Sequence, residues 1–417
     1  MRRKVQNRLS IKELRLFSLL GSFGVSQLLQ LLCATLRFPL IATSSDAYIL
    51  GQIFLWVNIQ TWGSVLIAGR VNVARISAQS SQSFMIQSRL SSLRFLAAIL
   101  LTLTLVVYSA LTTNLVWLGG LAPTLFLVTV LYILSPYYGF VQGLGKQNLI
   151  SHSSSISAVV GLVITWLVTA APFWSNLPES LKVLLVSAVG VVTILIPYFF
   201  SWLYVRRNFS LVSQSGNRRK ALREGAYELA AVLPPAIVSG FDAFSLAILG
   251  KSDELAEYGL ISRVALLTTF ISSALYVQIN NIAETRGSQD ITSFLKDTRR
   301  LTLLSLPTSL LFVFLAPVLV SILSAGKVAA GPDCVLAIFV VSLVLPTWIC
   351  ASANILPSRQ KRQRLGKEIL AYVLPISFLS TISLAAFFGA SGPFFASSLT
   401  YSICIVLATR LLGKTNK

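Results

Sequence analysis

Acidic side chains, histidine and cysteine are scarce in this sequence, and each scarcity removes a class of function. The 417 residues hold 14 Asp and Glu, one His and four Cys. The cysteines show no CxxC or zinc-like spacing, so we expect no metal, no cofactor and no disulfide framework. A membrane glycosyltransferase would need paired acids in an early outer loop, whereas the first outer turn here holds only Asp46. We therefore expect that the protein is not an enzyme.

Charge of either sign is rare overall, while apolar residues are abundant. Only 12% of the residues are charged, 55% are hydrophobic, and the mean hydropathy is +0.76. This composition is typical of an integral membrane protein. Stretches long enough to cross about 30 Å of hydrocarbon predict twelve spans. They lie at about 16–42, 48–68, 95–115, 121–142, 156–174, 183–204, 226–250, 257–281, 302–324, 333–355, 369–389 and 393–412.

The basic residues lie mostly at one side of the predicted spans. The N-terminus, the C-terminus and every second loop are rich in Lys and Arg, and the opposite side holds Lys182, Lys251 and Lys327. Such asymmetry predicts that both termini are cytoplasmic. The net charge of +20 then indicates contact with the anionic headgroups of membrane lipids, and we expect no binding of nucleic acid.

The chain contains an internal repeat. A span end, a Ser/Asp turn, a Tyr and a Gly that opens the next span occur around Gly51 and again around Gly259, half a chain length later. The basic loop 206–225 lies between the repeats. We predict an all-α protein with a six-helix lobe at 1–205, a cytoplasmic linker at 206–225 and a second six-helix lobe at 226–417. Because six spans is an even number, the lobes are related by a pseudo-two-fold axis along the membrane normal, and such pairs suit alternating access.

Arg37 lies inside the first predicted span, where a charge is costly. One reading is that its side chain snorkels to the outer headgroups. The other is that it faces a cavity, because Ser26, Gln27, Gln30 and Arg37 fall within an arc of about 100° on one helix face. The stripe favours the cavity, with Gln27 and Gln30 as additional substrate contacts.

Two further charges are predicted to lie within spans. Asp242 in span 7 occupies a depth similar to that of Arg37. It is either a structural ion pair to Arg37 or Arg263, or a group that couples transport to Na⁺ or H⁺, and the sequence does not separate these readings. Arg263 in span 8 is either an interface anchor or a second cavity arginine.

Prolines occur at related places in the two halves. Pro234 and Pro235 should kink or break span 7 midway, and Pro39 should kink span 1 more mildly. Kinks also serve packing alone in membrane helices. Their paired occurrence nevertheless predicts gating elements.

Three passages resemble the polysaccharide flippases of the Wzx type. They are GSFGVSQLLQLLCATLRFPLIATSSDAYILGQIFLWVNIQ at 21–60, FVQGLGKQNLI at 140–150 and AILGKSDELAEYGLISRV at 247–264. This family shares a superfamily with multidrug and toxin extruders (MATE) and lipid II flippases. The likeness extends over the whole chain in length, span number and halved organisation, and it implies a MATE-like arrangement. The lipid II flippases carry two further spans, for which this chain has no room.

The resemblance implies a function and partners. It implies that the protein moves an undecaprenyl-diphosphate-linked oligosaccharide across the bacterial plasma membrane, coupled to an ion gradient. Arg37 and Arg263 would hold the diphosphate, since guanidinium groups form bidentate bonds to phosphate. Glycosyltransferases or a polysaccharide polymerase would be partners. A small-molecule drug antiporter, a major-facilitator transporter and a non-transport component of polysaccharide synthesis remain alternatives.

Overall fold

The architecture comes from a computed structural model of the chain. The structure describes residues 22–43, 45–68, 84–87, 102, 115–144, 146–209, 211–214, 234–268, 291–329, 331–355 and 358–413. The predicted third span, most of the linker 206–225 and both chain ends therefore lie outside the described residues.

A described helix lies at every predicted span except the third. In the N-terminal half the helices are α2 (Ser22–Ala42), α3 (Ala47–Ala68), α6 (Leu115–Gly143), α7 (Gln147–Ala170) and α8 (Glu179–Asn208), with the short η2 (Trp174–Asn176). In the C-terminal half they are α10 (Pro234–Ile248), α11 (Ser252–Thr268), α13 (Ile291–Leu323), α14 (Pro332–Ile355), α15 (Arg359–Glu368), η3 (Ile369–Val373), α16 (Leu374–Phe388), η4 (Gly389–Ser391) and α17 (Gly392–Gly413). The all-helical fold class is confirmed.

Five of the described helical segments are long and apolar enough to cross a membrane. They are Gly119–Val141, Asn148–Ala170, Glu179–Asn208, Val335–Ser352 and Gln360–Gly413. Large apolar side chains on the outside of the bundle fit a lipid environment, since Phe314 is 79% exposed and Phe387 is 83% exposed. An apolar exterior of this kind is what a bilayer core selects.

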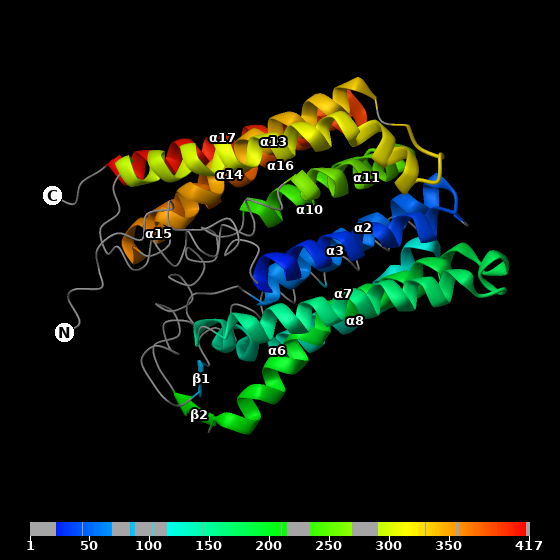
Figure 1. Ribbon diagram of the computed structural model, residues 1–417, viewed down its shortest axis with the longest axis horizontal. Coiled ribbons are helices and arrows are strands. Elements are labelled where there is room, and N and C mark those ends of the chain that lie inside the picture. The colour runs from blue at the N-terminus through cyan, green and yellow to red at the C-terminus, as the bar shows by residue number, and fades with distance from the viewer. Residues whose placement is uncertain are drawn as a thin grey trace.

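The helices form a layered bundle (Figure 1). Helices α13, α14, α16 and α17 make one layer, α6, α7 and α8 make the opposite layer, and α2, α3, α10 and α11 lie between them. The connections α2 to α3, α7 to α8 and α13 to α14 lie at the same end, which is the end predicted to be external. The inner pairs α2–α3 and α10–α11, which contain the predicted repeat, therefore carry most of the contacts between the described helices of the two halves.

Two repeat-related glycines bring α3 and α11 close together. A Cβ atom added at Gly51 would lie 2.5 Å from the carbonyl oxygen of Ser252, and one added at Gly259 would lie 2.4 Å from the ring of Phe54. Each glycine thus allows the opposite helix to approach more closely than any side chain would permit. One apolar cluster, which includes Phe54 and Tyr258, continues across this crossing.

The predicted gating prolines lie in helices. Pro39 lies within α2, as predicted. Pro234 and Pro235 belong to α10, whose described part begins at Pro234, so the predicted kink midway along span 7 falls at the edge of the described residues. The gating role of all three prolines stays a prediction.

A small sheet adds to the helical architecture. Strands β1 (Phe84–Gln87) and β2 (Leu211–Gln214) pair in parallel, with Phe84 opposite Leu211 and Gln87 opposite Gln214. One strand comes from the segment between the second and third predicted spans and the other from the predicted linker. The pairing gives backbone groups of both segments hydrogen-bond partners, and the sequence pattern did not predict it.

Candidate functional site: two cavities that share Arg37

Arg37 extends from α2 toward α7. Its Nε donates a hydrogen bond of 3.0 Å to Oγ1 of Thr165, which itself donates to the carbonyl oxygen of Gly161. Its Nη2 is buried and has no hydrogen-bond partner. The guanidinium is therefore held from one side and keeps an unsatisfied donor. This geometry favours the predicted cavity position over a side chain that snorkels to the headgroups.

The polar stripe of α2 divides into two parts. Near the helix start, Ser26 donates to the carbonyl oxygen of Ser151 at 2.8 Å and lies 2.5 Å from the Oγ of Ser155. These contacts join α2 to α7, as small polar residues commonly do between membrane helices. Gln30 donates to Ser26 and also lines a cavity. Gln27 lies in α2, but its side chain is outside the described residues.

Arg263 reaches the same region from the other half of the chain. It projects from α11 and its Cζ lies 5.2 Å from the ring centre of Phe38 and 5.5 Å from that of Phe54. Two aromatic faces attract the cation when it is removed from water. Its Nε is buried without a hydrogen-bond partner. Aromatic contact supports this guanidinium but leaves a donor for a ligand.

A cavity of about 160 Å³ joins the two arginines. Arg37 and Arg263 both line it, together with residues of α2, α3 and α8. The cavity was predicted to lie between the two halves. Its lining comes mainly from the N-terminal half, and Arg263 is the lining residue that the C-terminal half contributes.

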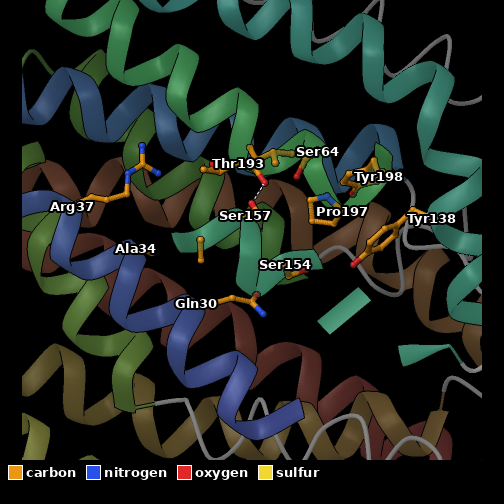
Figure 2. A pocket seen from close by; sticks show the side chains of 12 residues that line it. Gln30, Ala34, Arg37, Ser64, Tyr138, Ser154, Ser157, Thr193, Pro197 and Tyr198 are labelled. Atoms are coloured by element: carbon orange, nitrogen blue, oxygen red, sulfur yellow. Dashed lines mark hydrogen bonds between the residues drawn. The ribbon is translucent and has the colours of Figure 1, made fainter. Parts of the chain in front are cut away.

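A larger cavity of about 280 Å³ adjoins the first. The two share Ala34, Arg37, Thr193 and Ile194. Figure 2 shows Gln30 and Arg37 on one side of it, Ser154 and Ser157 on α7, and Thr193, Pro197 and Tyr198 beyond. Arg37 therefore stands where the two cavities meet.

The electrostatics of these cavities are those of an anion site. Among the residues that line them, the charged side chains are Arg37 and Arg263, and no Asp or Glu is present. Within the described chain, neither arginine forms a salt bridge. Two like charges side by side, each with an unsatisfied donor, favour a bound anion because it supplies both the countercharge and the hydrogen-bond acceptors.

Asp242 lies apart from the arginines in this conformation. Its carboxylate is buried in the C-terminal half, where Oδ2 accepts hydrogen bonds from Tyr258 at 2.8 Å and from Ser397 at 2.6 Å. Among the described residues it forms no ion pair with Arg37 or Arg263, so the predicted pair is absent here. Its Oδ1 is buried without a partner. The coupling role of Asp242 stays a prediction.

Sequence reasoning missed the residues that surround these charges. Thr165, Thr193 and Ser397 gave no signal, because hydroxyl residues are frequent in membrane helices and do not indicate which neighbour they meet. Tyr258 belongs to the predicted repeat, but the repeat did not indicate that it would bond to Asp242. Ser245, one turn after Asp242 on α10, donates its Oγ to the backbone carbonyl oxygen of Asp242 at 2.8 Å.

Comparisons with known proteins identify the fold. No family model and no curated protein matches the chain. Among solved structures, a MATE in complex with MaL6 is similar over 93% of this chain and 92% of its own length, with 12% identity and a TM-score of 0.51. The chain has a MATE-like fold. The outward-facing conformation of a multidrug resistance MATE family transporter of the MOP superfamily matches the same shares at 12% identity and a TM-score of 0.50.

A third structure has a higher TM-score. A solved chain named protein A matches with a TM-score of 0.56 and 14% identity, over 95% of both chains. Similarity over nearly the whole length shows that the MATE-like fold describes both halves of the chain together. At such low sequence identity, the similarity shows the architecture alone. The residues that line the cavities carry the information on the substrate.

Proposed function

We propose that the protein is a flippase that moves an undecaprenyl-diphosphate-linked oligosaccharide across the bacterial plasma membrane by alternating access. The moving bodies are the segments 1–205 and 226–417, joined by the linker 206–225, with both termini cytoplasmic. The MATE-like fold supports a membrane transporter, and the resemblance of the span 1 to span 2 region to Wzx-type flippases supports this substrate class.

The observation that carries the proposal is the shared cavity of Arg37 and Arg263. Each guanidinium has a buried nitrogen without a partner, and both line one cavity. A diphosphate offers several acceptor oxygens and a negative charge on each phosphate, which suits two arginines from different halves. Because one arginine comes from each half, movement of the halves relative to each other would change the distance between the arginines and therefore the affinity for the diphosphate headgroup.

Coupling to Na⁺ or H⁺ is assigned to Asp242. A buried carboxylate with one partnerless oxygen is costly in a membrane unless a proton or cation neutralises it. Its position in the C-terminal half separates it from the anion cavity, so the coupling ion and the headgroup would not compete for one site.

A small-molecule antiporter of the MATE kind is the second candidate. A similar structure is named a multidrug resistance transporter, and the fold fits that activity equally well. The lining of the two described cavities favours the flippase, because a cationic drug would meet two guanidiniums and no carboxylate there.

Reconstituted vesicles test the proposal. The wild-type protein should move fluorescent undecaprenyl-diphosphate-linked sugar between leaflets when a Na⁺ or proton gradient is imposed. Arg37→Ala and Arg263→Ala should each lower the rate at least tenfold, because one phosphate contact is lost. The matched control is Arg410→Ala, which removes an exposed arginine in the last turn of α17 and should keep the wild-type rate.

The same vesicles separate the alternatives. Gradient-driven movement of cationic dyes without movement of the lipid would establish the antiporter. Movement of neither would favour a non-transport component of polysaccharide synthesis. Normal lipid movement with alanine at both arginines would show that the site is elsewhere.

A further inference from the structure

The larger cavity has a lining of a different kind from the arginine cavity beside it. Apart from Arg37 at its edge, its polar lining consists of Ser and Thr hydroxyls, the Gln30 amide and the phenols of Tyr138 and Tyr198. The two tyrosine rings are stacked, with centroids 4.5 Å apart and an interplanar angle of 28°. Uncharged hydroxyl and amide groups beside aromatic rings match the alternating hydroxyl edges and C–H faces of a sugar ring.

The hydroxyls are arranged as hydrogen-bond acceptors. The hydroxyl of Ser157 donates to the carbonyl oxygen of Thr193. The hydroxyl of Thr193 donates to the carbonyl oxygen of Gly190. The hydroxyl of Ser64 likewise donates to the carbonyl oxygen of Thr61. Since a hydroxyl has one proton and two lone pairs, each keeps lone pairs that can accept from a ligand. Arg37 adds the donor, so the cavity suits a ligand rich in hydroxyl groups.

The cavity also has a size and a neighbour that restrict the ligand. Its volume of about 280 Å³ lies near the lower bound, roughly 300 Å³, of small-molecule pockets, which fits one sugar ring and not an oligosaccharide. It meets the arginine cavity at Arg37 and Thr193. A ligand in which a sugar is bonded directly to a diphosphate would therefore occupy both cavities at once.

We propose that this cavity is the subsite for the first, uncharged sugar of the substrate, the ring attached to the diphosphate. The inference rests on the proposed flippase function and assigns its sugar specificity to α2, α3, α6, α7 and α8. The rest of the oligosaccharide extends beyond the cavity and makes little contribution to recognition. The protein should thus select lipids by their first sugar.

Side chains that fill the cavity test this subsite. Ala158 and Ser154 line the larger cavity and not the arginine cavity. Ala158→Leu or Ser154→Leu should occupy the space of the sugar without touching either arginine. The matched control is Ala170→Leu at the exposed end of α7. Monodisperse elution of each purified variant checks that it is folded.

Two probes are compared by binding to the purified full-length protein in nanodiscs. One is undecaprenyl diphosphate, and the other is the same lipid carrying a single sugar, taken from a panel of glucose, galactose and N-acetylglucosamine. Wild type should bind at least one sugar-bearing lipid tenfold or more tightly than the sugar-free lipid. The filled variants should lose this tenfold preference and keep wild-type affinity for undecaprenyl diphosphate.

The outcomes distinguish the two proposals. If wild type binds sugar-free and sugar-bearing lipids equally, or if the filled variants keep the preference, the sugar subsite is refuted while the flippase proposal stands. If wild type binds neither kind of lipid, the flippase proposal fails and the subsite fails with it. The wild-type comparison needs no variant, so a misfolded variant does not remove the test.

Discussion

Lys327 and Ala42 join the two halves of the protein at the end predicted to be external. The Nζ of Lys327, in the connection from α13 to α14, lies 2.5 Å from the carbonyl oxygen of Ala42, the last residue of α2. It lies 2.6 Å from the carbonyl oxygen of Ser45 as well. A cation at a helix C-terminus meets the negative end of the helix dipole and carbonyls without helical partners. We call this contact the outer latch.

Removal of the outer latch should favour conformations in which the external end is open. Lys327→Met keeps most of the length of the side chain and removes the ammonium group and its charge. Spin labels at Ser175 and Ser321, exposed positions in the two halves, should report a larger population of long distances in this variant. An unchanged distance distribution would show that the latch has no part in closing this end. Lys361→Met, on α15, serves as the control.

The glycine crossing of α3 and α11 should be sensitive to a single methyl group. Gly51→Ala places a Cβ 2.5 Å from a backbone oxygen of α11, which neither helix can avoid without separating. Overpacking of this kind costs about 1–3 kcal/mol. We expect a lower thermal midpoint in detergent and a shift of the spin-label distances toward an open external end. Gly331→Ala is the matched control, because a Cβ there meets nothing within 4 Å, and its midpoint should equal that of wild type.

Removal of the charge of Asp242 should abolish ion coupling and leave substrate binding unchanged. Asp242→Asn keeps the shape of the side chain and removes the negative charge, while Tyr258 and Ser397 can still donate to its oxygen. The variant should bind the lipid substrate normally, whereas its transport rate should no longer respond to an imposed Na⁺ or proton gradient. Asp253→Asn, at an exposed position of α11, should retain the gradient response.

A gradient response that survives in Asp242→Asn would contradict the coupling role. Asp242 would then be a structural group that holds α10 to α11 and α17 through Tyr258 and Ser397. In that case Tyr258→Phe should lower stability by about 0.6 kcal/mol, the average for hydrogen bonds between membrane helices, and should leave transport unchanged.

The three charged residues within the spans show which features of the site the sequence can predict and which it cannot. Arg37 and Arg263 were found because a charge within an apolar run is rare and demands an explanation. Asp242 was found in the same way, with an ion pair to Arg37 or Arg263 and an ion-coupling role as open alternatives, and in this conformation neither arginine is its partner. Helical spacing fixes the face and depth of a residue on its own helix, and it does not fix which helix that face meets. Tyr258 and Ser397 became the partners because α10 packs on α11 and α17.

The sequence alone determined the membrane character, the positions of most helices and the two unusual arginines. The reason is that a bilayer imposes length, apolarity and internal backbone hydrogen bonding on each segment separately. Only the tertiary structure decided that both arginines line one cavity, that a hydroxyl-lined cavity adjoins it, and that Asp242 stands apart. These relationships depend on packing between helices that are far apart in the chain. Small residues such as Gly51 and Gly259 permit this packing, but their presence in the sequence does not indicate which helix they contact.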